Sequence, residues 1–145
     1  MNELKFGFKQ LNNPKATTLI LGSMPSVSSL EASEYYAHPQ NAFWWILAAL
    51  TGVPGTAPYS KRLDALIETD IALWDVIAAC ERPGSLDSEI KTTSIRINDF
   101  EQFFKQHRNI QKVLLNGGKA YELFQRHVAK ANLLPPGITT IKLPS

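Results

Sequence analysis

The sequence predicts a three-layer α/β fold, in which helices cover both faces of a central four-stranded, mainly parallel sheet. Short apolar runs rich in β-branched residues, such as residues 17–21 and 71–76, are typical of buried strands. Stretches with helical periodicity, such as residues 61–68, separate these runs. Alternating strands and helices form parallel sheets with right-handed crossovers, and such sheets bind ligands outside the carboxyl ends of their strands.

Start and stop signals bound each element along the chain. Gly22 ends the first strand, and Gly52 ends the first helix, for which Asn41 is a candidate N-cap. Asn98 or Asp99 begins the third helix, and residues 80–89, with a Pro-Gly pair, are predicted to be a loop. We expect strands at residues 17–21, 71–76, 112–115 and 139–143, and helices at residues 42–50, 61–68, 98–107 and 119–130.

Composition limits the classes of protein to consider. The 145 residues are 44% hydrophobic, which suits one compact domain over residues 1–145. The 15 basic and 13 acidic residues nearly cancel, so binding to nucleic acid would need a local patch. Cys80 is the only cysteine, which excludes an internal disulfide and fits a reducing cytosol. Without a secretory signal or an apolar run of about 20 residues, the protein is expected to be cytoplasmic.

Two of the predicted loops carry unusual residues. Residues 22–26, GSMPS, have the composition of a loop that offers backbone amides to a ligand, although a tight turn explains them as well. In residues 35–41, YYAHPQN, Tyr36 offers a flat ring for stacking, and Pro39 fixes the backbone between His38 and Asn41. Alternatively, Asn41 caps the next helix, His38 bonds a carbonyl group and Tyr36 packs in the interior.

LILGSMPS followed by YYAHPQNAFWWIL resembles the uracil-DNA glycosylase superfamily, and within it the hypoxanthine-DNA (deoxyinosine) glycosylases most, with the mismatch-specific uracil-DNA glycosylases next. The similarity continues through LWDVIAACERPGSLDSEI and VLLNGGKAYELF, so it covers nearly the whole chain. The resemblance implies a four-stranded parallel sheet between helices and a pocket for one extruded nucleotide. It also implies DNA containing deaminated bases as the partner and no cofactor.

Site roles are transferred from the family position by position. Ser23 matches an asparagine that orients the attacking water in mismatch-specific relatives, and Asn41 is the replacement that hypoxanthine-type enzymes suggest. Tyr36 matches the aromatic residue that stacks on the flipped base. Asp75 ends the second strand where some relatives place a base-reading asparagine. The resemblance thus implies Asn41 and Ser23 as catalytic residues and, as base-binding residues, Gly22, Met24, Tyr36 and Asp75.

An ionised Asp75 would oppose the negative charge that develops on the leaving base, so Asp75 must be protonated or turned away from the base. Contacts to DNA phosphates are expected from Ser26, Ser85 and Lys91, with Arg82, Arg96 and Lys119 as further candidates. Each of these basic residues is individually better explained as a solvated surface charge. The histidines His38, His107 and His127 lack metal-ligand spacing, and the last two are expected at the surface.

The family pattern has a second motif and a further helix after the last strand, and both are expected to be missing from this chain, which ends in Lys142-Leu143-Pro144-Ser145. The leading interpretation is a monofunctional glycosylase that hydrolyses the N-glycosidic bond of hypoxanthine, with uracil and xanthine as further candidate bases. The alternatives are a non-catalytic binder of damaged DNA and a binder of free nucleobases or nucleosides on the same fold.

Overall fold

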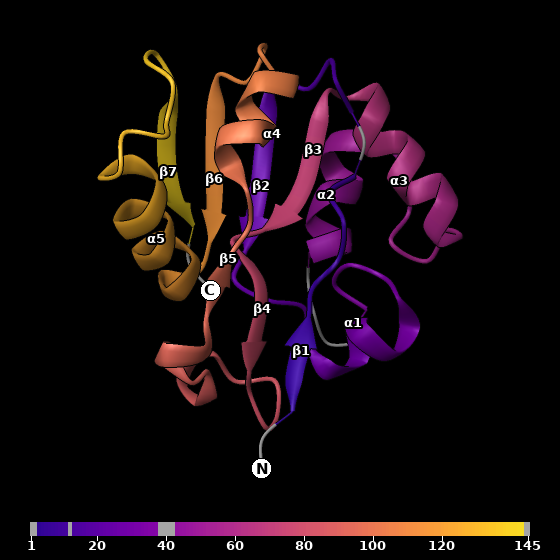
Figure 1. The fold of residues 1–145 in the computed structure, drawn as a ribbon. Coiled ribbons are helices and arrows are strands. Elements are labelled where there is room, and N and C mark those ends of the chain that lie inside the picture. Colours follow the sequence, from indigo (N-terminus) through magenta and orange to yellow (C-terminus); the bar gives the residue numbers. More distant parts are fainter. Residues whose placement is uncertain (1–2, 12, 38–42, 144–145) are drawn as a thin grey trace.

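A computed structural model describes residues 3–11, 13–37 and 43–143. Its main sheet contains β2 (Thr18–Gly22), β3 (Ile71–Asp75), β6 (Lys112–Asn116) and β7 (Thr139–Leu143). The strands lie in the order β3-β2-β6-β7 and all neighbouring pairs are parallel (Figure 1). The predicted four-stranded parallel sheet is therefore confirmed. His38, Pro39, Asn41, Pro144 and Ser145 lie outside the described residues.

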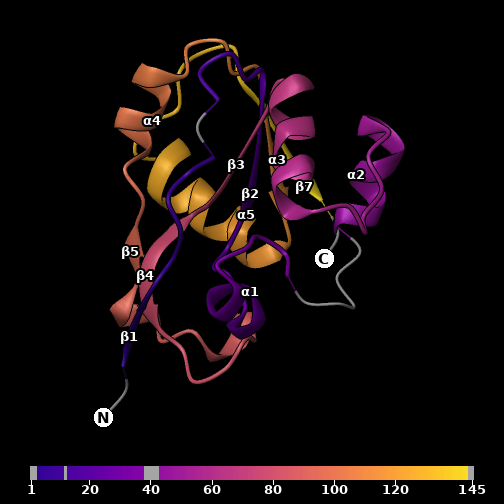
Figure 2. The same cartoon turned by 90° about the vertical axis from the view of Figure 1, so that its right-hand side faces the viewer.

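Helices cover both faces of this sheet (Figure 2). On one side lie α2 (Phe43–Thr51) and α3 (Tyr59–Glu68), and on the other α4 (Phe100–Gln106) and α5 (Gly118–Phe124), which continues as a π-helical turn over Gln125–Ala129. Side chains alternate along β2, because Leu19 and Leu21 join the core under α4 and α5 while Ile20 joins the core under α2 and α3. The three-layer prediction is confirmed.

A second, antiparallel sheet was not predicted. It contains β1 (Leu4–Phe6), β4 (Ile77–Glu81) and β5 (Arg96–Ile97), in the order β1-β4-β5. Figure 1 shows it beyond the carboxyl ends of β2 and β3. The predicted loop at residues 80–89 was therefore wrong at its start, because Cys80 and Glu81 pair with β1. Three short helical elements were also not predicted. They are α1 (Val27–Ala32) and two 3-10 turns, Asp87–Glu89 and Thr92–Ser94.

His107 is buried, with only 3% of its surface exposed, which contradicts the predicted surface position. Its ring stacks on Phe103 with the centroids 4.0 Å apart, and its Nδ1 lies 3.0 Å from the Phe103 carbonyl oxygen. The helix ends at this residue, so the imidazole folds back on its own last turn. His127 is exposed, as predicted. Among the helices in the described ranges, none has the length and apolar character that a bilayer span requires.

Asp99→Ala is expected to lower the free energy of unfolding by about 1 kcal/mol, because it removes an N-cap. The Asp99 carboxylate accepts a hydrogen bond from the Gln102 backbone N–H at 3.0 Å at the start of α4. Urea unfolding measures the change. Asp64→Ala removes an exposed carboxylate from α3 instead and should change the stability by less than about 0.5 kcal/mol. Equal losses in the two variants would contradict the capping role.

Candidate active site

A pocket of about 180 Å³ opens at the carboxyl ends of β2, β3 and β6. These strand ends are where a parallel sheet of this kind binds ligands. The pocket brings together residues that are far apart in the sequence, from the loop after β2, the turn before α2, the end of β3, the segment after β4 and the end of β6. Its lining residues are Gly22, Ser23, Met24, Pro25, Ser26, Ser29, Tyr35, Tyr36, Asp75, Asp87 and Asn116.

Backbone pairing fixes the loop after β2 against the segment after β3. Gly22 is the register partner of Asp75, and the Gly22 and Ser23 carbonyl oxygens accept hydrogen bonds of 2.9 Å and 3.0 Å from the amides of Val76 and Ile77. A Cβ atom at Gly22 would lie only 2.7 Å from Asp75 Oδ1 and 3.2 Å from Tyr36 Oη. The absence of a side chain at this position therefore lets the carboxyl and phenol groups reach the same wall of the pocket.

The backbone of Tyr36 is strained, with a φ of 53°, which is an outlier for a bulky residue. Hydrogen bonds on both sides hold this conformation. The Tyr59 hydroxyl accepts from the Tyr35 amide at 2.9 Å, and Ser29 Oγ accepts from the Ala37 amide at 3.0 Å. The Tyr36 ring stacks on Phe43, with centroids 3.8 Å apart and planes 15° from parallel. A base could therefore stack only on the other face of Tyr36.

Asp75 is buried, with 4% of its surface exposed, and its Oδ2 has no hydrogen-bond partner within the described ranges. Burial raises the pKa of this carboxyl group to about 7, and the Asp87 charge adds to the rise while Arg82 opposes it. A carboxyl group with this pKa is partly protonated near neutral pH. The protonated form carries no charge, so it does not oppose the negative charge that would develop on a leaving base.

Arg82 was a candidate for a phosphate contact, with a solvated surface charge as the alternative, and both predictions are wrong because the residue is only 1% exposed. Its Nη2 atom donates a hydrogen bond to the Pro25 carbonyl oxygen, and its Nε and Nη1 atoms have no partner in the part of the chain that the structure describes. The guanidinium group thus binds the backbone of the loop after β2 at Pro25. Its positive charge also lowers the pKa of Asp75, against the effect of burial.

Asn116 was missed as a site residue. Its Nδ2 atom donates to Tyr36 Oη at 3.3 Å, and its side chain lines the pocket. The sequence contained a signal for it, because Asn116 directly follows the predicted strand at residues 112–115, and the topology rule places that strand end at the same edge as Gly22 and Asp75. Asp87 also lines the pocket and was likewise not predicted as a site residue.

The family model of the uracil DNA glycosylase superfamily matches residues 8–145. The chain belongs to the uracil DNA glycosylase superfamily. Two similar curated proteins, both named hypoxanthine DNA glycosylase, come from Methanosarcina barkeri and Methanosarcina acetivorans. The first is 38% identical over 119 residues, which are 81% of this chain and 74% of that protein. The second is 36% identical over 120 residues, 82% of this chain and 75% of that protein.

A solved structure shows the same fold in the superfamily. It is the solution NMR structure of a Methanosarcina acetivorans protein described provisionally as a uracil DNA glycosylase. It is 33% identical in sequence, superimposes with a TM-score of 0.81, and the match covers 99% of this chain and 84% of the other. The family and fold predicted from the GSMPS and YYAHPQNAFWW stretches are confirmed.

In this superfamily member the predicted base-binding residues Gly22, Met24, Tyr36 and Asp75 all line one pocket, together with the predicted catalytic residue Ser23. Asn41, the other predicted catalytic residue, lies outside the described residues. No group of three or more His, Cys, Asp or Glu side chains within the described ranges could hold a metal ion. The arrangement offers a carboxyl, a phenol, an amide and a serine hydroxyl to a ligand.

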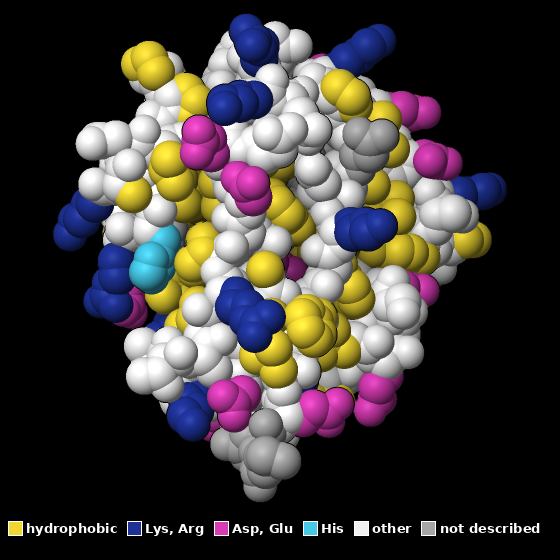
Figure 3. Space-filling model, viewed as in Figure 1, with side chains coloured by type: hydrophobic (Ala, Val, Ile, Leu, Met, Phe, Trp, Pro, Cys, Tyr) yellow, Lys and Arg dark blue, Asp and Glu magenta, His cyan; other side chains and the backbone are white. Residues whose placement is uncertain are grey.

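The three predicted DNA-binding residues have different surroundings. Ser26 lines the pocket and caps α1, because its hydroxyl accepts from the Ser29 amide at 3.1 Å. Ser85 Oγ accepts from the Val27 amide at 2.8 Å, beside the pocket. Lys91 is exposed and does not line the pocket. On the face that Figure 3 shows, basic and acidic side chains are interspersed, as the nearly balanced net charge suggests.

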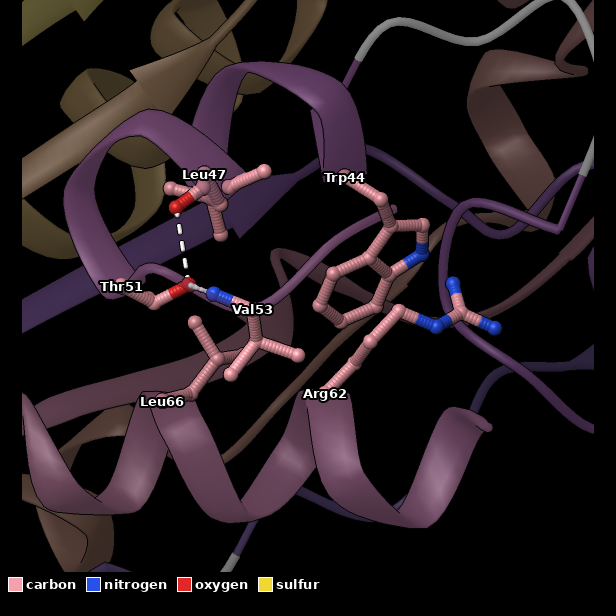
Figure 4. Close-up of a pocket in the computed structure, with 7 residues that line it drawn as sticks. Trp44, Leu47, Thr51, Val53, Arg62 and Leu66 are labelled. Atoms are coloured by element: carbon pink, nitrogen blue, oxygen red, sulfur yellow. Dashed lines mark hydrogen bonds between the residues drawn. The ribbon is translucent and has the colours of Figure 1, made fainter. Parts of the chain in front are cut away.

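A second cavity, between α2 and α3, is too small to be a base-binding site. It measures about 10 Å³, room for about one water molecule. Its walls include Trp44, Leu47 and Leu66, with the Arg62 guanidinium 4.8 Å from the Trp44 ring centroid (Figure 4). Thr51 caps its own helix there by donating to the Leu47 carbonyl oxygen at 3.0 Å. This cavity is a packing gap between two helices.

Proposed function

We propose that the protein is a DNA repair glycosylase that hydrolyses the N-glycosidic bond of hypoxanthine in DNA, with uracil and xanthine as the further deaminated bases to test. The superfamily membership and two relatives named hypoxanthine DNA glycosylase support this proposal. The observation that carries it is the pocket at the strand ends, where Tyr36, Asp75 and Asn116 surround Gly22 and Ser23. Its partner is DNA containing a deaminated base.

The target base would be rotated out of the duplex into this pocket, at a cost of a few kcal/mol that is smaller for a mispaired base. Tyr36 would stack on the base with the ring face that Phe43 does not cover. Cleavage of the bond would give an oxocarbenium-like sugar and a negatively charged base. The backbone N–H groups of residues 22–26, which every residue there except Pro25 carries, would lie beside the base and stabilise that charge as it develops.

Asp75 would read the edge of the base in its protonated form. A carboxylic acid offers one donor and one acceptor, and the amide-like edge of hypoxanthine or uracil offers one carbonyl oxygen and one N–H. The two edges are complementary, and a neutral Asp75 does not oppose the charge of the leaving base. The burial that raises the pKa of Asp75 to about 7 supports this assignment.

Water would be the nucleophile, held by Ser23 and Asn41 as the catalytic residues. No lysine lines the pocket among the described residues, so we propose hydrolysis without a lyase step. The reaction requires no cofactor. A cytoplasmic location and a single domain over residues 1–145 remain predictions from composition.

Cleavage of a synthetic duplex with one inosine tests the proposal, after alkali has converted abasic sites to strand breaks. We expect Asn41→Ala to cut the rate by roughly 10²-fold, because it removes a group that orients water or stabilises the leaving base. Asn109→Ala, an exposed asparagine outside the pocket, should cleave at the wild-type rate. The cleavage rates of duplexes that contain uracil, xanthine or adenine in place of inosine rank the substrates.

Two outcomes would favour the alternatives. Salt-sensitive DNA binding without strand breaks would indicate a non-catalytic binder of damaged DNA. Binding of free nucleosides without salt-sensitive affinity for DNA would indicate a nucleoside binder. An unchanged rate in Asn41→Ala would leave Asn41 as a helix cap only.

A further inference from the structure

Ser23 makes a strong hydrogen bond to a residue 64 positions later in the chain. Its Oγ donates to Asp87 Oδ1 at 2.6 Å, and both side chains line the pocket. Ser23 is 7% exposed, whereas Asp87 is exposed at the start of a 3-10 turn. A distance of 2.6 Å is in the range of charge-assisted O–H···O⁻ bonds, which are about twice as strong as neutral ones.

This bond determines what the serine hydroxyl can do for a substrate. A hydroxyl group has one proton to donate and two lone pairs that accept. Because the proton of Ser23 is directed at Asp87, only the lone pairs remain for a molecule in the pocket. Ser23 is therefore prepared to accept a proton from a water molecule and not to donate one to the base.

Two further contacts hold the Asp87 segment against the loop after β2. Ser85 Oγ accepts from the Val27 amide at 2.8 Å, and Arg82 donates to the Pro25 carbonyl oxygen. The three contacts join residues 82–87 to residues 23–27. The position of the Asp87 carboxylate is thus set on both sides by bonds within the folded chain, although its side chain is exposed.

We propose, on the basis of the glycosylase function proposed above, that Asp87 is a positioning residue that acts through Ser23 as the final proton acceptor for the attacking water. The water oxygen forms a bond to C1′, and the C1′–N bond breaks with its electron pair leaving on the base. One water proton passes to Ser23 Oγ as the Ser23 hydroxyl proton passes to Asp87. Asp87 then releases this proton to solvent, and the anionic base takes up a proton from solvent.

The charges around Asp87 suit this role. The Asp87 charge adds to the rise that burial causes in the pKa of Asp75, so it favours the protonated form of that buried carboxyl group. The positive charge of the buried Arg82 acts on the same two groups as the Asp87 charge, Asp75 and Cys80, and with the opposite sign. A carboxylate that lines the pocket and is exposed repels DNA phosphates, so Asp87 is not explained as a DNA-binding residue.

The decisive variant is Asp87→Asn, whose amide oxygen can still accept from Ser23 but is a far weaker base. With enzyme in excess over an inosine duplex, we expect the single-turnover rate to fall at least about tenfold, since general-base assistance contributes about 10²–10⁴-fold when direct. Affinity for an undamaged duplex of the same length should stay equal or rise, because a negative charge is lost. Glu89→Gln, on the same turn, is the charge-matched control and should retain the wild-type rate.

A double-mutant cycle with Ser23→Ala tests the coupling. Because the two residues act in series, the double variant should lose no more rate than the worse single variant. Two outcomes would overturn the proposed proton transfer through Ser23 to Asp87 while the glycosylase function stands. One is that the rate losses of the two single variants multiply in the double variant. The other is a wild-type rate in Asp87→Asn with an unchanged urea midpoint. A wild-type protein that cleaves no deaminated base would overturn both. If Asp87→Asn fails to fold, two other variants decide the question in the same assay. Asp87→Glu keeps the carboxylate and should retain most of the rate, whereas Ser23→Ala should lose it.

Discussion

Gly22→Ala is expected to lower the excision of hypoxanthine by about 10²-fold or more. The added methyl group would lie 2.7 Å from Asp75 Oδ1 and 3.2 Å from Tyr36 Oη, both closer than a Cβ atom normally comes to a neighbour. Neither neighbour can move freely, because Asp75 is buried and Tyr36 is held in a strained backbone conformation. A displacement of the order of 1 Å at a site residue is enough to cost about 10²-fold in rate.

Gly118→Ala is the matched control for this substitution. Gly118 begins α5, and a Cβ atom there would have no neighbour within 4 Å. We expect Gly118→Ala to cleave at the wild-type rate and to unfold at the same or a slightly higher urea concentration. Overpacking at Gly22 should cost about 1–3 kcal/mol of stability. A Gly22→Ala protein that cleaves as fast as Gly118→Ala would show that the Asp75–Tyr36 wall is not the binding surface.

The sequence sufficed for the main sheet because its strands carry strong local signals. Residues 139–143 were predicted with the bounds that the structure has, and β2, β3 and β6 were placed to within one residue at each end. The second sheet has weaker signals, since β1 and β5 contain three and two residues and exist only through pairing with β4. Such short strands depend on partners far along the chain, which periodicity does not reveal.

The candidate site shows the same division between local and non-local signals. The topology rule placed Gly22 and Asp75 at one edge of the sheet, and the structure brings them into register. The Ser23–Asp87 bond joins positions 64 residues apart, and no spacing in the sequence predicts it. Arg82 and His107 were assigned to the surface because charged and polar residues are mostly exposed, and here neighbouring carbonyl groups bind them in the interior.

Asp75→Asn is expected to change how stability depends on pH. The ordinary pKa of the group is 3.8, and burial raises it to about 7 in the folded protein. Between these values the folded state binds a proton that the unfolded chain does not, so stability falls as pH rises through this window and is constant with respect to this group above it. At about 1.36 kcal/mol per pKa unit, the loss from pH 5 to pH 8 is about 2–3 kcal/mol.

The asparagine variant cannot ionise and should lack this loss, so its free energy of unfolding should fall less than that of the wild type between pH 5 and pH 8. Urea unfolding at several pH values measures both slopes. Asp64→Asn, an exposed carboxylate on α3, is the charge-matched control and should follow the wild-type slope. Parallel slopes for wild type and Asp75→Asn would show that the carboxyl group is ionised throughout this range.

The same substitution separates the two possible states of Asp75 during cleavage. If the protonated carboxyl group reads the base, the cleavage rate of the wild type falls as pH rises above about 7, because the ionised form opposes the charge of the leaving base. Asp75→Asn keeps one donor and one acceptor without charge, so it should cleave well and lose this fall. Asp75→Ala keeps neither and should cleave slowly at every pH. A rate that instead rises through pH 7, with Asp75→Asn as inactive as Asp75→Ala, would require an ionised carboxylate at the base.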